Sequence, residues 1–403
     1  MRSRLQPNSL SKCIKIAMEK YPTVARPSIT KEYLAEFNSL SNRQGKVVNY
    51  SSKPFNLDLE FKLFTQNYFP NNFNAISSKY KSETVSLDVD ASIKWVRAHN
   101  FPKRVINDLK LLSEQGFERL PLSSVAVHSK IEQTTKLNKL SRWFNDVVSR
   151  SIIASTYAIA ALFAPPFLEL KKRFKDTLVT PFYYVDGMTP LQISTLLSTI
   201  ENVKYVIEDD LTQQDGQTSS DIIELEFKIY EALGLDLDIL EIYKRCHQMW
   251  RWKGHGIHGL GDAMRLTGQV TTALGNAITN LIVHNRFVAR NKHHIKFLGF
   301  LGDDVIFLSN SMLNVSQHGT ETKEIYNMIS KITHRERVGG FLSMIVHTLD
   351  DVPTICPHFK RTRHRFSVCN YTFTAETREE KISNRTLSYC FMLGNIKESV
   401  AIA

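Results

Sequence analysis

The sequence of 403 residues is poor in several features that would point to particular classes of protein. Its five cysteines are scattered and odd in number, and no two of them form a Cys-x-x-Cys pair. A zinc ribbon and a disulfide framework are therefore not indicated, and a reducing, intracellular setting is favoured. The basic N-terminal residues are not followed by an apolar run, so we expect no secretory signal there. The chain also lacks internal repeats and low-complexity tracts.

Long apolar runs are scarce as well. One charge-free stretch, residues 151–168, is just long enough to suggest a membrane span. It contains Pro165-Pro166 and several hydroxyl-bearing residues, and the mean hydropathy of the chain is −0.22. We therefore expect a buried strand or helix at this position.

Acidic residues are outnumbered: 40 Asp and Glu stand against 51 Lys and Arg, which gives a net charge of +11. The basic residues recur in short clusters such as 171–173, 335–337 and 361–365. This pattern suits a polyanionic partner, nucleic acid first and an anionic membrane surface second, although each cluster alone also fits an ordinary solvated face. The composition is globular, and the length suggests two or three domains or one large multi-lobed enzyme.

The clearest positive signal lies at residues 297–308. Two apolar runs rich in strand formers flank Gly302-Asp303-Asp304. This pattern predicts a β-hairpin with two adjacent carboxylates at its tip. Two acids presented in this way are suited to holding a divalent metal.

Charged residues also lie on other predicted strands. Residues 204–210 read as a strand that ends in acids and leads to Asp215, before a helix over about 219–233. An alternating run at 125–132 carries Lys130, and a strand-like run from residue 149 carries Arg150. We expect these two basic residues to lie on neighbouring extended segments.

A helix predicted over 272–287 carries a polar stripe. Thr272, Asn276, Asn280 and His284 are spaced four residues apart, so they share one face. Asn and Thr without a formal charge are an unusual choice for a solvent face, which favours the lining of a site. The segment 243–261 is rich in His, Trp and Gly, and it reads as a mobile loop in preference to a zinc site.

The remaining predicted elements are less informative about function. They are helices at 91–98, 103–115, 191–200 and 321–332, a loop containing Gly339-Gly340, a strand at 341–347, a hairpin at 359–373 and helical structure over the last 30 or so residues.

In their order along the chain, these features resemble the palm of viral RNA-dependent RNA polymerases of the positive-strand type. Motif A of that family, Asp-x4-Asp, is matched by Asp210 and Asp215, and motif C, Gly-Asp-Asp, by residues 302–304. Motif B, Ser/Thr-Gly-x3-Thr-x3-Asn, is matched by Thr267-Gly268 with Thr272 and Asn276. Ser is the commoner residue where this chain has Thr267.

The resemblance extends on both sides of these motifs, over roughly residues 125–395. Lys130 and Arg150 resemble motif F, the basic fingertip that holds incoming phosphates. Residues 339–347 and 365–372 stand where motifs D and E belong, and 385–390 look like the start of a thumb. No motif D lysine is evident in the sequence; His334, Arg335 and Arg337 are the candidates to replace it.

The resemblance implies an α+β, right-hand fold of fingers, palm and thumb, with an antiparallel palm sheet flanked by helices. It implies an N-terminal region and fingers at 1–198, a palm at 199–371 with a finger insertion near 234–266, and the start of a thumb at 372–403.

The resemblance also implies roles for single residues. Asp210 and Asp303, supported by Asp304, would be catalytic ligands of Mg²⁺ or Mn²⁺ in two-metal phosphoryl transfer. Asp209 is next to Asp210, so its side chain should point to the opposite strand face and serve the structure.

Other residues would bind the nucleotide. Asp215, Thr272 and Asn276 are the candidates for reading the ribose 2′-hydroxyl, and Gly268 permits a close backbone approach. Lys130 and Arg150 would neutralise the triphosphate.

The expected function is therefore template-directed RNA synthesis from NTPs during viral genome replication and transcription. Its expected partners are the RNA template, the nascent RNA and NTPs, with other viral replication proteins and membrane association left open. The expected location is the host cytoplasm, including membrane-associated replication sites. Two alternatives remain open: a non-catalytic RNA-binding replication scaffold, and a reverse-transcriptase-like polymerase, although Leu301-Gly302 differs from the Tyr-x that usually precedes the acids in that class.

Overall fold

The structure is a computed structural model that describes residues 26–27, 48–116, 123–130, 133–134, 150–247, 250–254, 258–261, 265–349 and 351–358. The basic cluster at 361–365, the predicted hairpin at 359–373, motif E and the predicted thumb lie outside these residues.

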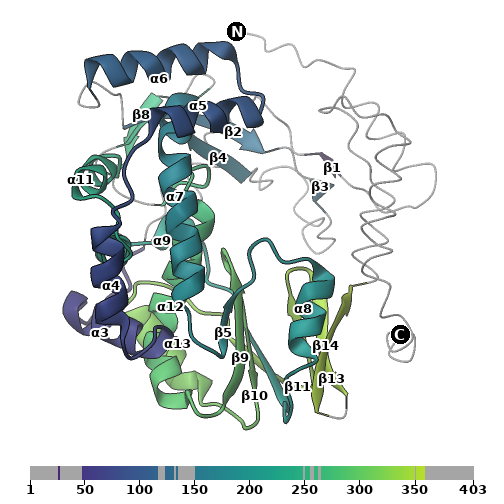
Figure 1. Cartoon of the computed structure of the whole chain (residues 1–403). Coiled ribbons are helices and arrows are strands. Elements are labelled where there is room, and N and C mark those ends of the chain that lie inside the picture. The colour runs from purple at the N-terminus through teal and green to yellow at the C-terminus, as the bar shows by residue number, and fades with distance from the viewer. Residues whose placement is uncertain are drawn as a thin grey trace.

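A five-stranded sheet, here named the central sheet, lies in the lower part of the described chain in Figure 1. Its strand order is β11 (Thr333–Glu336), β6 (Tyr205–Asp209), β10 (Asp304–Ser309), β9 (Ile295–Leu301) and β5 (Phe182–Tyr184). All neighbours are antiparallel except β5, which runs parallel to β9. The expected antiparallel sheet therefore has one parallel pair, at the β5 edge. The chain between β5 and β9 spans residues 185–294 and contains several helices and strands, and such a long crossover connection permits a parallel pair.

Helix α12 (Thr272–Asn291) packs on this sheet and is itself enclosed by α3 (Leu57–Tyr68), α10 (Ser220–Ala232) and α13 (Val315–Glu324). Its apolar side chains, including Leu281 and Val288, are fully buried. Asn276, Asn280 and His284 are buried with them. Because an unpaired buried polar group is costly, each of these polar side chains requires a partner.

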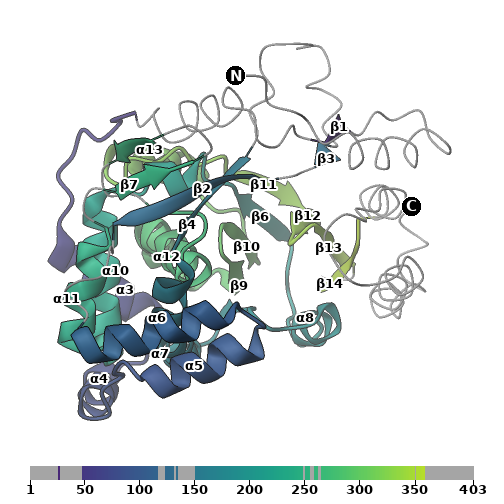
Figure 2. The same cartoon turned by 90° about the horizontal axis from the view of Figure 1, so that it is seen from above.

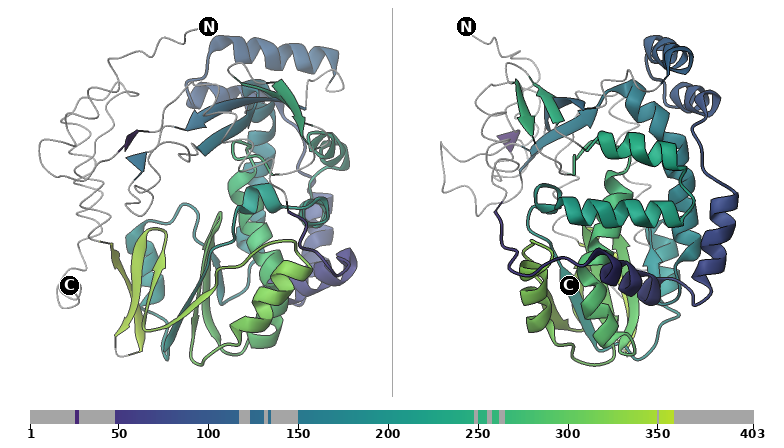
Figure 3. Two further views of the ribbon diagram at one scale, coloured as in Figure 1. Left: turned by 180° about the vertical axis from the view of Figure 1, so that it is seen from behind. Right: turned by 90° about the vertical axis from the view of Figure 1, so that its left-hand side faces the viewer.

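A three-stranded sheet of β12 (Val338–Phe341), β13 (Met344–Leu349) and β14 (Val352–Pro357) stands beside the central sheet with helix α8 (Pro190–Leu197), as Figures 1 and 3 both show. Gly339 and Gly340 lie inside β12, so the predicted loop is wrong there. A Cβ atom at Gly339 would lie 3.0 Å from Glu208 Oε1, and Gly340 N–H donates to the same oxygen at 2.7 Å. The glycines allow β12 to lie close to β6.

A four-stranded sheet lies at the other end of the molecule, in the upper part of Figure 1, and Figure 2 views that end from above. Its order is β4 (Arg150–Ser155), β2 (Ser124–Lys130), β7 (Trp250–Lys253) and β8 (His258–Gly261). Strands β7 and β8 form an antiparallel hairpin with Trp250 buried. The loop expected between residues 243 and 261 is thus wrong for these strands. A further short pair joins β1 (Arg26–Pro27) to β3 (Gln133–Thr134).

The other helices of the described chain are α4 (Phe73–Ser82), α5 (Val89–Ala98), α6 (Lys103–Gln115), α7 (Tyr157–Thr177), α9 (Gln214–Gln217) and α11 (Leu237–Arg245). The helix predicted at 103–115 is confirmed. The charge-free stretch is divided between β4 and α7, and no described helix is long and apolar enough to cross a membrane. The helix predicted at 321–332 is wrong, because α13 begins earlier, where the Asn314 side chain accepts a hydrogen bond from Ser316 N–H.

Candidate active site

The acids of motifs A and C lie at one end of the central sheet, where β6 and β9 end and β10 begins. Strand β6 ends at Asp209, and Asp209 pairs with Val305 near the start of β10. The turn Gly302-Asp303 joins β9 to β10, and Gly302 has a φ of 59°. This register brings Asp210 and the Asp303-Asp304 turn to the same end of adjacent strands. The side chains of all three acids are exposed there.

Asp209 and Asp210 point to opposite faces of β6, as strand geometry predicts. Asp209 is 4% exposed, whereas the Asp210 side chain is 75% exposed. Lys331 lies beside Asp210: its Nζ is 3.5 Å from Asp210 Oδ2, and its N–H donates to the Asp210 carbonyl oxygen at 3.1 Å. The exposed pair contributes little to stability by itself, but it puts a cation next to a candidate catalytic acid.

The polar stripe of α12 contacts these motifs along its length. Asn276 Nδ2 donates to Asp215 Oδ1 at 2.9 Å, and Asn280 Nδ2 donates to the Gly302 carbonyl oxygen at 2.8 Å. His284 Nε2 lies 3.1 Å from Asp209 Oδ2. The stripe is therefore not a solvent face: Asn276, Asn280 and His284 are buried against residues of motifs A and C. One helix connects motifs A, B and C.

Thr272 differs from the rest of the stripe. Its hydroxyl donates to backbone oxygens of Leu266 at 2.7 Å and Gln269 at 2.9 Å. These contacts close the loop that precedes α12. Thr272 thus stabilises the conformation of the motif B loop, because its hydroxyl donates to two carbonyl oxygens of that loop.

The motif B loop is attached to strand β4. Gly268 N–H donates to the Ile153 carbonyl oxygen at 2.8 Å, and Thr267 Oγ1 accepts from Ile153 N–H at 3.0 Å. A Cβ atom at Gly268 would lie 2.8 Å from both Ile153 O and the Ala154 Cβ. Glycine is required here because the loop lies directly against the strand.

The two candidate phosphate-binding residues are cross-strand partners. Lys130 of β2 is paired with Arg150 of β4 at the end of the antiparallel ladder. The prediction that their segments are neighbours is confirmed. Strand β4 therefore carries Arg150 of this basic pair and also makes the backbone contact with Gly268 of the motif B loop.

His247 is a buried residue behind that loop. Its Nδ1 lies 2.9 Å from the Tyr243 carbonyl oxygen and donates to it, and its Nε2 accepts from Gln269 Nε2 at 3.4 Å. Burial lowers the pKa of His247 to about 4. The ring is therefore neutral, with one nitrogen donating and the other accepting.

Sequence reasoning missed a set of buried partners of Asp209. His318 Nε2 lies 3.1 Å from Asp209 Oδ2, and Ser330 Oγ is 2.8 Å from each carboxylate oxygen. Burial alone would raise the pKa of Asp209, but the hydrogen bonds from His284 and His318 outweigh it and hold the pKa well below its ordinary value. The α12 stripe signalled His284, whereas nothing in the local pattern signalled His318.

The three residues considered for motif D lie on or next to β11. Arg335 Nη1 is 3.8 Å from Glu208 Oε1, and His334 stacks on Tyr205 with ring centroids 5.0 Å apart. Arg337 follows β11 with a φ of 63°. The ion pair of Asp210 is made instead by Lys331, which sequence reasoning did not consider.

Comparison with known proteins identifies the family of the chain. The family model described as RNA dependent RNA polymerase matches residues 59–359, which is more than half of the chain. The chain therefore belongs to the RNA-dependent RNA polymerase family, and the resemblance seen in its motifs is confirmed.

The similar proteins are viral. The chain is 25% identical over 240 residues to the replicase large subunit of Youcai mosaic virus, covering 58% of this chain and 15% of that protein. It is 23% identical over 333 residues to the replicase large subunit of Odontoglossum ringspot virus, isolate Singapore 1, covering 77% of this chain and 19% of that protein. It is 27% identical over 209 residues to that of Pepper mild mottle virus, strain Spain. The matched region thus spans less than a fifth of these relatives.

Proposed function

We propose that the chain carries out template-directed RNA synthesis from NTPs in viral replication and transcription. The observation that carries the proposal is the pairing of Asp209 with Val305, because it brings the acids of motifs A and C to the same end of neighbouring strands. Asn280 adds a hydrogen bond from α12 to the motif C turn. Because the chain belongs to the RNA-dependent RNA polymerase family, we assign the polymerisation reaction to these acids.

The donor set at this end of the strands fits a divalent metal. Asp210, Asp303 and Asp304 offer exposed carboxylates, and hard oxygen donors are what Mg²⁺ and Mn²⁺ prefer. When bound, such ions supply charge neutralisation at the attacking and leaving oxygens of phosphoryl transfer. The three acids would hold the ions, with Asp303 and Asp210 as the main ligands and Asp304 in support. Lys331 would give up its contact with Asp210 to solvent or to phosphate.

Selection of a ribonucleotide requires a donor and an acceptor for the 2′-hydroxyl. Asp215 and Asn276 are joined by a 2.9 Å hydrogen bond, which fixes the amide orientation. Asn276 Oδ1 is buried and has no hydrogen-bond partner in the described part of the chain. Asn276 Oδ1 could therefore accept a hydrogen bond from a ribose 2′-hydroxyl. Asp215 is the second candidate for binding the same hydroxyl.

Phosphate binding falls to the paired Lys130 and Arg150, which neutralise the triphosphate as it enters.

We further propose the right-hand arrangement, with fingers in residues 1–198, the palm in 199–371 with an insertion near 234–266, and the thumb from 372. Consistent with an insertion that belongs to the fingers, β7 pairs with β2. RNA, NTPs and other viral replication proteins would be the partners, in the host cytoplasm.

The test is incorporation of labelled NTPs on a primed RNA template by the purified chain, with Mg²⁺ or Mn²⁺ present. We expect template-dependent incorporation that chelation abolishes. Asp303→Ala should remove it, and Asp304→Ala should reduce it less. The exposed Asp108→Ala on α6 is the control for loss of a carboxylate elsewhere. The proposal fails if the folded wild-type chain incorporates nothing, and the site assignment fails if Asp303→Ala stays active.

A further inference from the structure

Three side chains converge on the core side of β6, beneath the candidate catalytic acids. Asp209 comes from β6, His284 from α12 and His318 from α13, and all three side chains are fully buried. The Nε2 atoms of both histidines lie 3.1 Å from Asp209 Oδ2. One carboxylate oxygen and two imidazole nitrogens therefore lie within 4.8 Å of one another.

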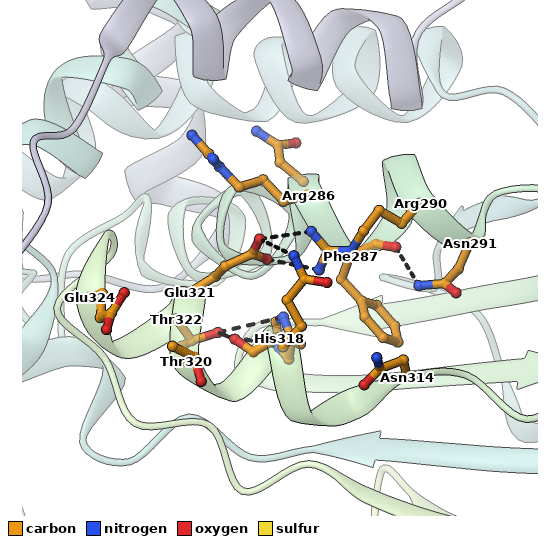
Figure 4. A network of polar contacts seen from close by, with 12 residues as sticks. Arg286, Phe287, Arg290, Asn291, Asn314, His318, Thr320, Glu321, Thr322 and Glu324 are labelled. Carbon is orange, nitrogen blue, oxygen red and sulfur yellow. Dashed lines mark hydrogen bonds and ion pairs between the residues drawn. The ribbon is translucent and has the colours of Figure 1, made fainter.

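Contacts outside the cluster hold the two histidines in place. Arg290 of α12 makes two ion-pair contacts of 2.8 Å with Glu321 of α13, which fixes one helix against the other (Figure 4). Thr322 lies beside His318, and its hydroxyl donates to the His318 carbonyl oxygen at 2.8 Å. The two imidazole rings stack with centroids 4.6 Å apart and planes at 22°. The ligand atoms are thus positioned by the surrounding helices.

The hydrogen bonds of His284 determine which of its ring nitrogens faces Asp209. Its Nδ1 is 2.7 Å from the Asn280 carbonyl oxygen, which can only accept, so Nδ1 carries a proton. A neutral ring then has a lone pair at Nε2, and this lone pair faces the carboxylate oxygen of Asp209. Two lone-pair atoms at this distance need a proton or a metal ion between them.

The distances in the cluster fit a metal ion as well as a proton. An N–H···O hydrogen bond spans about 2.7–3.2 Å, which includes the 3.1 Å seen twice here. Ligand atoms bound about 2.0–2.1 Å from a tetrahedral ion lie about 3.3 Å apart, which is also close to these distances. A ligating histidine typically donates its other ring N–H to a carbonyl or carboxylate, as His284 does.

We propose that Asp209, His284 and His318 bind a divalent transition-metal ion, Zn²⁺ in the first place, in a closed structural site. Two imidazoles with one carboxylate suit Zn²⁺, whereas Mg²⁺ prefers oxygen ligands alone. The second oxygen of Asp209 and the hydroxyl of Ser330, which is 2.8 Å from both carboxylate oxygens, would complete the coordination. The ion joins β6, α12 and α13 one residue from Asp210, on the opposite face of the strand.

The test is the metal content of the untagged full chain, produced with Zn²⁺ in the medium and passed through gel filtration in Mg²⁺ buffer. We expect about one zinc ion per chain, measured by inductively coupled plasma mass spectrometry. His284→Gln and His318→Gln should each lose it. His247→Gln, which alters a buried histidine outside the cluster, should keep it. A wild-type chain without zinc, or zinc retained in both cluster variants, overturns the proposal.

X-ray absorption at the zinc edge of the wild-type chain keeps the test decisive if the cluster variants do not fold. The expected spectrum shows two imidazole ligands with oxygen completing the shell. A spectrum with sulfur ligands would place the ion at cysteines and overturn the proposal. Neither measurement uses polymerase activity, so its outcome is independent of the proposed function.

Discussion

The side-chain amide of Asn280 donates a 2.8 Å hydrogen bond to the backbone carbonyl oxygen of Gly302, so that helix α12 holds the turn of the catalytic hairpin from below. The bond is partly buried and joins two elements that carry different motifs. We therefore propose that Asn280 positions Asp303, although Asn280 belongs to none of the recognised motifs.

Asn280→Ala should therefore slow nucleotide incorporation while leaving the fold intact. Losing one neutral hydrogen bond costs about 1 kcal/mol, and the freed turn moves the metal ligands, so we expect kcat to fall about tenfold or more. Primer-extension kinetics with circular dichroism would measure both effects. Asn291→Ala is a matched control, because Asn291 on the same helix donates to the Phe287 carbonyl oxygen at 2.8 Å, away from the turn. Equal losses in the two variants would contradict the assignment.

Asn276→Ala should weaken discrimination between ribonucleotides and deoxyribonucleotides. A site that hydrogen-bonds a substrate hydroxyl rejects the analogue lacking it, and that rejection is lost with the hydrogen-bonding group. We expect the ratio of kcat/KM for rNTP over dNTP to fall about tenfold or more, mainly because rNTP use declines. Single-nucleotide competition assays would show it. If both substrates decline by the same factor, Asn276 acts on the fold or on catalysis and not on sugar selection.

Gly275→Ala should destabilise the protein, although alanine is the better helix former by about 1 kcal/mol. A Cβ atom there would overlap Arg265 Nη1 and lie 2.8 Å from Glu226 Oε1. Arg265 and Glu226 form an ion pair with side chains 1% and 2% exposed, and disrupting a buried pair costs about 3–5 kcal/mol.

The control for this substitution is Gly319→Ala in α13, where a Cβ atom meets nothing within 4 Å. It should be neutral or stabilise the protein by up to about 1 kcal/mol. Chemical denaturation of both variants would test the contrast. A Gly275→Ala variant as stable as the wild type would mean that the Arg265–Glu226 pair tolerates displacement.

Local pattern predicted the parts of the site that lie on single elements. The hairpin around Gly302, the strand ending at Asp209 and the stripe of α12 all follow from periodicity, because each signal is carried by neighbouring residues. The partners of Asp209 could not be read in this way, since His318 comes from an element more than a hundred residues along the chain.

The predicted elements that were wrong also depend on contacts between segments that are distant in the sequence. Gly339 and Gly340 suggest a loop by composition, but the close approach of β12 to β6 requires them within a strand. The start of α13 was missed because the cap at Asn314 is followed by residues with no strong apolar period. The parallel pairing of β5 depends on a crossover, and the three residues of that strand carry no information about it.

The buried His247 predicts how stability depends on pH. Its pKa is lowered from the ordinary 6.5 to about 4 by burial. Above the ordinary value both the folded and unfolded states hold a neutral ring, so the full stability is present. As the pH falls below that value, the unfolded state binds a proton that the folded state excludes, and stability is lost until about pH 4. Between about pH 7 and pH 5 this loss amounts to roughly 2 kcal/mol.

His247→Gln removes this contribution, so its free energy of unfolding should fall less steeply than that of the wild type across the same interval. The variant should also be less stable at neutral pH, because Gln269 loses the acceptor that holds it behind the motif B loop. Urea denaturation at a series of pH values would measure both slopes. His99→Gln, at an exposed position at the end of α5, is the matched control for the loss of a histidine elsewhere in the chain. Parallel curves for wild type and His247→Gln would show that the His247 ring binds its proton equally in the folded and unfolded states.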